Sequence, residues 1–77
     1  MINEKQWVES FKEELKYYMK ERRLTQRELA DCSRLAESTI SKCLHGDKMP
    51  NARTINNIAY ALNIDVGQLM DFGQLIE

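Results

Sequence analysis

Side chains able to act as nucleophiles or metal ligands are few in this sequence. Ser41 and His45 stand four residues apart, as a nucleophile and its base would on one helix face. No carboxylate occupies a matching helical position to orient the imidazole, so the pair fits an exposed polar face better than a catalytic site. One histidine and two cysteines, Cys32 and Cys43, are too few for a tetrahedral zinc site. We therefore expect no enzyme, and no metal, cofactor or small-molecule ligand.

The side chains best suited to an anionic partner lie in the middle of the chain. The formal net charge of −1 taken alone argues against a nucleic-acid partner. Residues 22–53, however, carry seven basic and four acidic side chains and are net +3, whereas residues 1–21 are net −1 and residues 54–77 net −3. Such a basic centre creates a local field that matters more for steering than the total charge does. From charge alone, an ordinary solvated face stays the stronger interpretation.

Length and composition indicate a single domain over residues 1–77. The chain is 43% hydrophobic and 30% charged, and 3 glycines and 1 proline are few for an all-β protein. Two cysteines are too few for a disulfide framework, no apolar run is long enough to span a membrane, and residues 1–10 contain no apolar signal core. We expect a cytoplasmic protein without membrane contact and with free thiols, although one bridge between the two cysteines stays open.

Signals for helix starts and helix ends divide the chain into five segments. N-capping residues, three of them with glutamine or glutamate three places on, occur at Asn3 with Gln6, Thr25 with Glu28, Asn51, and Asp65 with Gln68. Ser10 with Glu13 leaves a later start open for the first helix. Gly46 and Asn63 are expected to end helices in the left-handed conformation. With apolar residues at intervals of three and four, these signals predict an all-α fold with helices near 4–22, 25–32, 36–45, 51–62 and 65–70.

The second and third predicted helices and the turn between them, residues 33–36, have the spacing of a helix-turn-helix. The run Leu24 to Ala30 (LTQRELA), the run Ser38 to Lys42 (STISK), and then Gly46, Pro50, Thr54, Ile58, Ala59, Ala61 and Leu62 resemble the phage-repressor and Cro-type helix-turn-helix family. This is the lambda-repressor-like, or xenobiotic-response-element, class. The resemblance runs from about residue 11 to 70, and residues 71–77 form an apolar tail beyond it.

This resemblance implies a compact five-helix DNA-binding domain with the helix-turn-helix at helices 2 and 3. It further implies sequence-specific binding of double-stranded DNA in transcriptional control, as a repressor-like homodimer on a palindromic operator. The third helix, about 36–45, would enter the major groove with its N-terminal residues at base edges. Its expected base-reading positions are Glu37, Ser38, Thr39, Ser41 and Lys42.

Each of these side chains suits a particular part of a base pair. Lys42 can donate to guanine O6 or N7, or to a phosphate. Hydroxyls at Ser38 and Thr39 can donate or accept, and the Thr39 methyl can touch a thymine methyl. Glu37 can only accept, so cytosine N4 is its natural partner. The alternative role of its carboxylate is to stabilise the N-terminus of the helix through the helix dipole.

Phosphate contacts are expected from five residues around the recognition helix. The resemblance implies that Gln26, in the first turn of the second helix, contacts a phosphate and braces the third helix. The other candidates are Arg27, Lys48, Asn51 and Arg53, which position a protein on DNA without reading its sequence. For each of these, a solvated side chain is an equally good interpretation.

Three positions depart from the family pattern. Arg34 stands where the turn usually has glycine, so a left-handed conformation there would be strained. Ala36 stands where a serine or threonine usually caps the recognition helix, and that helix should start without a side-chain cap. Ser33 replaces a usual apolar residue.

The sequence predicts the surface for binding a second copy less clearly than it predicts the DNA-binding surface. Leu44 is expected to face outward on the third helix and to form a dimer seam with the tail residues Phe72, Leu75 and Ile76. Alternatively the tail folds back over Trp7 and the first helix. A different class of function also stays open, namely a protein-interaction module on the same scaffold, such as an antirepressor or toxin-associated regulator that uses its acidic ends.

Overall fold

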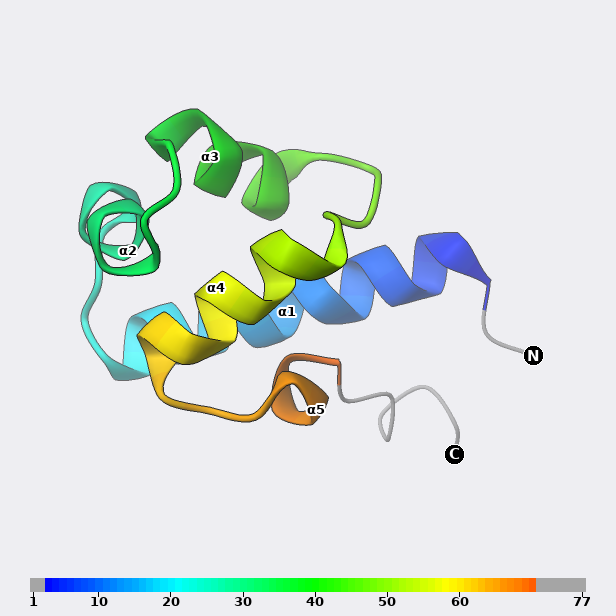
Figure 1. Ribbon diagram of the computed structural model, residues 1–77. Helices are drawn as coiled ribbons and strands as arrows, with labels where there is room; N and C mark the ends of the chain where they lie inside the picture. Colours follow the sequence, from blue (N-terminus) through cyan, green and yellow to red (C-terminus); the bar gives the residue numbers. More distant parts are fainter. Residues whose placement is uncertain (1–2, 71–77) are drawn as a thin grey trace.

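The computed structural model describes residues 3–70, which fold into five α-helices joined by short turns (Figure 1). The helices are α1 (Glu4–Glu21), α2 (Gln26–Ser33), α3 (Glu37–His45), α4 (Ala52–Leu62) and α5 (Val66–Leu69). Residues 3–70 contain no strand, so the all-α fold is confirmed. Each helix end lies within one residue of its expected position. Most of the one-residue differences arise because the expected ranges counted capping residues as helical.

Side-chain caps define where α1, α2 and α4 begin. Asn3 and Gln6 each accept a hydrogen bond from the other's backbone N–H, at 2.9 and 3.0 Å. Thr25 and Glu28 form the same reciprocal pair at the start of α2. Asn51 accepts a bond from the first turn of α4 at 2.8 Å. Each cap satisfies backbone donors that a helix start leaves without partners, and the earlier of the two expected starts for α1 is confirmed.

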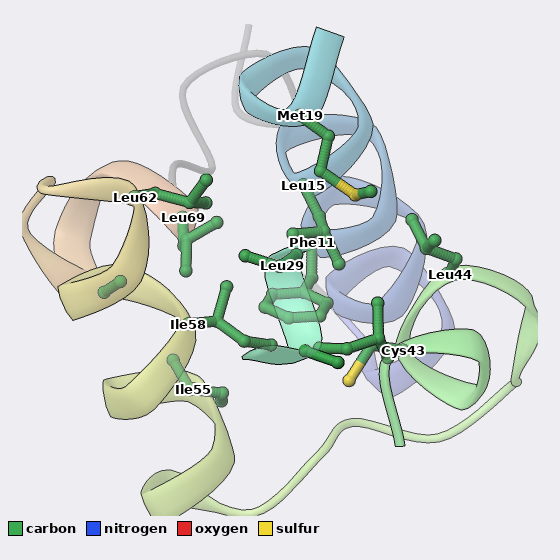
Figure 2. Packing of buried hydrophobic residues seen from close by; sticks show 13 residues of the cluster. Phe11, Leu15, Met19, Leu29, Cys43, Leu44, Ile55, Ile58, Leu62 and Leu69 are labelled. Carbon is green, nitrogen blue, oxygen red and sulfur yellow. The ribbon is translucent and has the colours of Figure 1, made fainter. Parts of the chain in front are cut away.

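The core consists of apolar side chains contributed by all five helices (Figure 2). Helix α2 packs against α3 and α4, α1 packs against α3 and α5, and α5 also contacts α4. Phe11, Leu15, Leu29, Ile58 and Leu62 are all buried. Each such side chain contributes about 1.5–3 kcal/mol through its removal from water. This packing holds α3 by one face and leaves its opposite face in solvent.

Leu44 belongs to this core, and the expectation that it faces outward is wrong. Its side chain is only 6% exposed. Because α1 packs against α3, Leu44 is covered by the first helix (Figure 2). It is therefore not a dimer contact. The other three expected dimer residues, Phe72, Leu75 and Ile76, lie outside the described residues.

The end of α3 also differs from expectation. Gly46 is extended, with φ −78° and ψ 174°, rather than left-handed. Its N–H donates to the Lys42 carbonyl at 2.7 Å. A Cβ at Gly46 would lie 2.5 Å from the same oxygen. Glycine is thus needed here for a close backbone approach and not for a positive φ. Asn63, by contrast, ends α4 in the expected left-handed conformation.

The turn between α2 and α3 accommodates all three departures from the family pattern. Arg34 is left-handed, with φ 58° and ψ 39°. Ser33 is buried, and its hydroxyl donates to the Leu29 carbonyl at 2.6 Å, so a polar group replaces an apolar one without losing a partner. Ala36 makes no side-chain cap to α3, as expected.

Candidate nucleic-acid interface

Helix α3 presents polar side chains on the face opposite its core contacts. Ile40 and Cys43 point into the core. The five expected base-reading residues comprise the exposed Glu37, Ser38 and Lys42 and the half-buried Thr39 and Ser41. A polar face of this kind, held rigidly by a buried opposite face, is what reading base edges requires.

The first turn of α3 carries a negative charge at an uncapped end. Ala36 supplies no side-chain acceptor, and Glu37 is the one acidic residue in the first turn. A carboxylate at this end interacts favourably with the positive end of the helix dipole. This placement supports a stabilising role for Glu37 beside its expected role as an acceptor of a cytosine amino group.

A shallow hollow of about 250 Å³ joins α3 to the following loop and to the start of α4. Four expected site residues line it together: Thr39 and Lys42 from the base-reading set, and Lys48 and Asn51 from the phosphate set. Cys43, Met49, Pro50 and Thr54 complete its lining. The structure thus brings two of the five expected base-reading residues and two of the five expected phosphate-binding residues onto one continuous surface.

Charge around this loop is separated between two sides. Lys42 and Lys48 bring two ammonium groups to the hollow, and none of its lining residues is acidic. Asp47 lines a different hollow, which it shares with Glu4, Lys5 and Glu9 of α1, so that three of the four charged residues there are acidic. The positive side of the loop therefore faces the same way as the polar face of α3, a local field suited to an anionic partner.

Asn51 performs two tasks at the edge of the hollow. Its Oδ1 accepts the bond from the Thr54 N–H that caps α4. That bond fixes the side-chain orientation and leaves the amide NH₂ as the group able to donate to a phosphate oxygen.

The remaining phosphate candidates lie outside the hollow. Gln26 is half-buried in the first turn of α2, whereas Arg27 on the same helix is exposed. Arg53 is exposed in the first turn of α4. Gln26 and Arg27 therefore come from a helix that packs directly against α3, whereas Arg53 comes from α4, which packs against α2.

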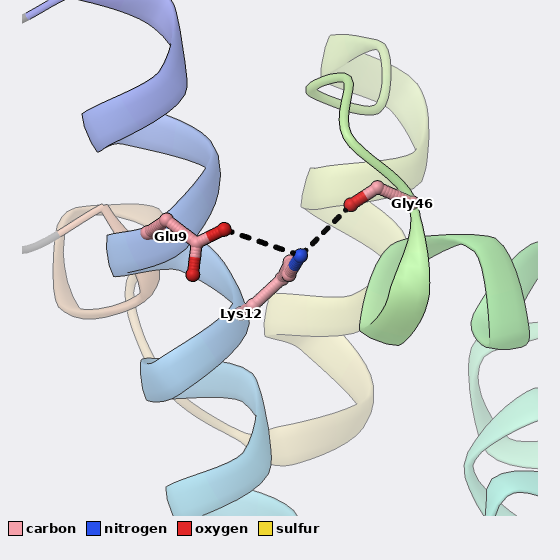
Figure 3. A network of polar contacts seen from close by, with 3 residues as sticks. All are labelled: Glu9, Lys12 and Gly46. Carbon is pink, nitrogen blue, oxygen red and sulfur yellow. Dashed lines mark hydrogen bonds and ion pairs between the residues drawn. The ribbon is translucent and has the colours of Figure 1, made fainter.

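Lys12 and Met49 were not among the residues expected in this region, and Pro50 was expected only as part of the family pattern. Met49 and Pro50 precede the Asn51 cap, a local signal that the loop is fixed there. Lys12 has no such signal. Its Nζ donates to the Gly46 carbonyl at 2.9 Å across 34 positions of sequence, and lies 3.4 Å from a Glu9 carboxylate oxygen (Figure 3).

Other chemistry has little basis in the part of the chain that the structure describes. No cluster of three metal-ligating side chains occurs within residues 3–70, and no helix there is long and apolar enough to cross a membrane. Both cysteines are free, Cys32 exposed and Cys43 buried. Burial raises the pKa of the Cys43 thiol, so the side chain stays neutral and acts as a small apolar residue beneath the hollow.

Comparison with known proteins agrees with this geometry. A search of curated proteins finds no match for the chain. The model of the Cro/C1-type HTH DNA-binding domain matches residues 14–74, which include the whole helix-turn-helix, the hollow and α5. The match covers well over half of the 77 residues. The chain therefore belongs to the Cro/C1-type helix-turn-helix family of DNA-binding domains.

Proposed function

We propose that the chain is a repressor-like transcriptional regulator that binds double-stranded DNA by sequence, with α3 in the major groove. The hollow shared by Thr39, Lys42, Lys48 and Asn51 carries this proposal, because it joins base-reading and phosphate-binding groups on one surface. A protein that reads sequence needs both, since phosphate contacts set the register in which base contacts are made.

Each group then has a distinct role. Lys42 donates to guanine O6 or N7. Ser38, Thr39 and Ser41 contact neighbouring base edges through their hydroxyl groups. Glu37 accepts from a cytosine amino group. The DNA backbone is held on either side of α3 by the phosphate set, Gln26, Arg27, Lys48, Asn51 and Arg53. The proposal is for a binding protein and assigns no catalytic role to any residue.

A homodimer on a palindromic operator completes the proposal. Each copy supplies one recognition helix, and two copies related by a twofold axis place these helices about 34 Å apart, one turn of DNA. Both cysteines are free, which supports a reducing compartment, the cytoplasm.

Binding-site selection from random duplex DNA, followed by affinity measurements at several salt concentrations, tests the proposal. The logarithm of the affinity should fall against the logarithm of salt with a slope of about −0.9 per phosphate neutralised. Lys42→Ala should cost about 1–3 kcal/mol at one base position and relax the preference there, whereas Lys16→Ala, an exposed lysine of α1, should not.

The competing function, a protein-interaction module, predicts a different outcome. Undetectable binding to random duplex at low salt, together with no effect of Lys42→Ala, would overturn DNA binding. The acidic ends of the chain would then become the surfaces to investigate.

A further inference from the structure

The loop between α3 and α4, residues 46–51, is fastened at both ends. At its start, the Gly46 carbonyl accepts a bond from Lys12 at 2.9 Å (Figure 3). At its end, Asn51 caps α4 at 2.8 Å. Lys48 lies between these two fastenings and lines the hollow that also contains Lys42. The position of Lys48 therefore depends on both of them.

The Lys12 fastening has the chemistry of a strong contact. A charged donor makes a stronger bond to a carbonyl than a neutral donor does. The carbonyl it reaches follows the last turn of α3, at the negative end of the helix dipole, where a cation is favoured. The Lys12 side chain is only 15% exposed, so water screens this bond less than it would on the surface.

The start of α1 flanks the same loop in two further places. Trp7 lines a hollow with Met49, and Val8 lines another with Asp47. Lys12 itself precedes residue 14, where the family match begins. The positioning contact is thus made by a part of this chain that lies before the matched domain.

We infer that Lys12 is a positioning residue for DNA binding, which it serves by fixing the loop that presents Lys48 to the phosphate backbone. The inference rests on the proposed function. Lys12 touches no DNA itself under this inference, because its ammonium is directed at the Gly46 carbonyl and at Glu9.

Lys12→Met removes the ammonium and keeps the apolar stem, and Lys12→Arg keeps a charged donor. Lys16→Met is the matched control, with the same change of charge on the same helix but from an exposed site. For the selected operator we expect Lys12→Met to lose about five- to tenfold in affinity, Lys12→Arg to retain most of it, and Lys16→Met to stay within about twofold of the parent.

A double-mutant cycle with Lys48→Ala separates positioning from direct contact. If Lys12 acts through the loop, Lys12→Met should cost no more than about twofold once Lys48 is gone. Additive losses would mean that Lys12 meets phosphate directly, and would overturn the inference. So would equal affinities of Lys12→Met and Lys16→Met.

Amide hydrogen exchange of residues 47–49 in the DNA-free protein gives a second readout. Exchange should be faster in Lys12→Met than in the parent or in Lys16→Met, and unchanged exchange would count against the fastening even if Lys12→Met lowers overall stability. If the parent binds no DNA while the exchange difference is present, the proposed function fails and the loop fastening stands. If the parent binds DNA and neither readout differs, the inference alone fails.

Discussion

Arg34 adopts a left-handed backbone conformation in the turn of the helix-turn-helix, with φ 58° and ψ 39°. An L side chain in this region costs roughly 1 kcal/mol or more, a cost that glycine does not have. Arg34→Gly removes this strain but also makes the unfolded chain more flexible, which offsets part of the gain. The free energy of unfolding should therefore rise by about 0.5–1 kcal/mol. In a thermal melt this corresponds to a rise of a few degrees.

The control for Arg34→Gly lies on the preceding helix. Arg27 is also exposed but sits within α2, so Arg27→Gly should lower stability by about 1 kcal/mol. If the glycine at position 34 lowers the melting temperature as well, the left-handed turn is not a source of strain.

Gly46 is expected to tolerate no side chain. A Cβ there would meet the Lys42 carbonyl oxygen at 2.5 Å, a backbone atom that cannot move without disturbing the end of α3. Gly46→Ala should cost about 1–3 kcal/mol in denaturant unfolding. Gly67→Ala is the matched control, because a Cβ at Gly67 meets nothing within 4 Å, and helical alanine should stabilise by up to about 1 kcal/mol. Equal effects of the two substitutions would contradict this account.

At the scale of single helices, local sequence was sufficient to predict most of the structure. Caps such as Thr25 and Asn51 act within three residues, so their partners are visible in the sequence. The orientation of Leu44 was not predictable in this way, since it depends on α1 covering the end of α3. The bond from Lys12 to Gly46 crosses 34 positions and leaves no local pattern.

The candidate site follows the same division. The polar face of α3 follows from helical spacing, because Ile40 and Cys43 mark the buried side. Lys42 and Lys48 line the same hollow because of the path that the loop after α3 takes. Helical periodicity does not predict the path of a loop.

The capping box of α2 should make stability depend on pH. The Thr25 backbone N–H first, and its side chain second, hold the pKa of Glu28 below its ordinary value. Because the pKa of Glu28 is lower in the folded chain than in the unfolded chain, its carboxylate stabilises the folded state at pH values above the unfolded-state pKa. This contribution is lost as the pH falls through the folded-state pKa. Glu28→Gln should flatten the acid part of a stability-against-pH curve, since its amide oxygen accepts the same bond at every pH.

Glu13→Gln is the control for this pH dependence. Glu13 is exposed on α1, outside the capping box, so its replacement should leave the acid decline as steep as in the parent. An identical decline in the parent and in Glu28→Gln, measured by urea unfolding from pH 7 to acid, would show that the capping box does not contribute to it.

At the scale of the whole molecule, the charge distribution limits what one copy can do. The total of −1 combines a +3 centre with flanks of −1 and −3. The described residues measure 35 × 21 × 19 Å and contain one helix, α3, in the position proposed to read DNA. A single copy should bind random DNA weakly, since few phosphates are neutralised, and should cover one half-site only.

Two copies should therefore bind the selected operator cooperatively, because two recognition helices about 34 Å apart match half-sites 10–10.5 base pairs apart. Sedimentation velocity should give two chains per duplex at saturation. Inserting about five base pairs between the half-sites turns the second site to the opposite side of the DNA and should abolish cooperativity while leaving half-site affinity unchanged.

If the apolar tail joins the copies, replacing Phe72, Leu75 and Ile76 together by serine should abolish cooperativity on the unaltered operator and leave half-site affinity unchanged. Saturation at one chain per duplex, with monomers alone in free solution, would remove the dimer and leave Lys42 and its neighbours to supply specificity from a single half-site.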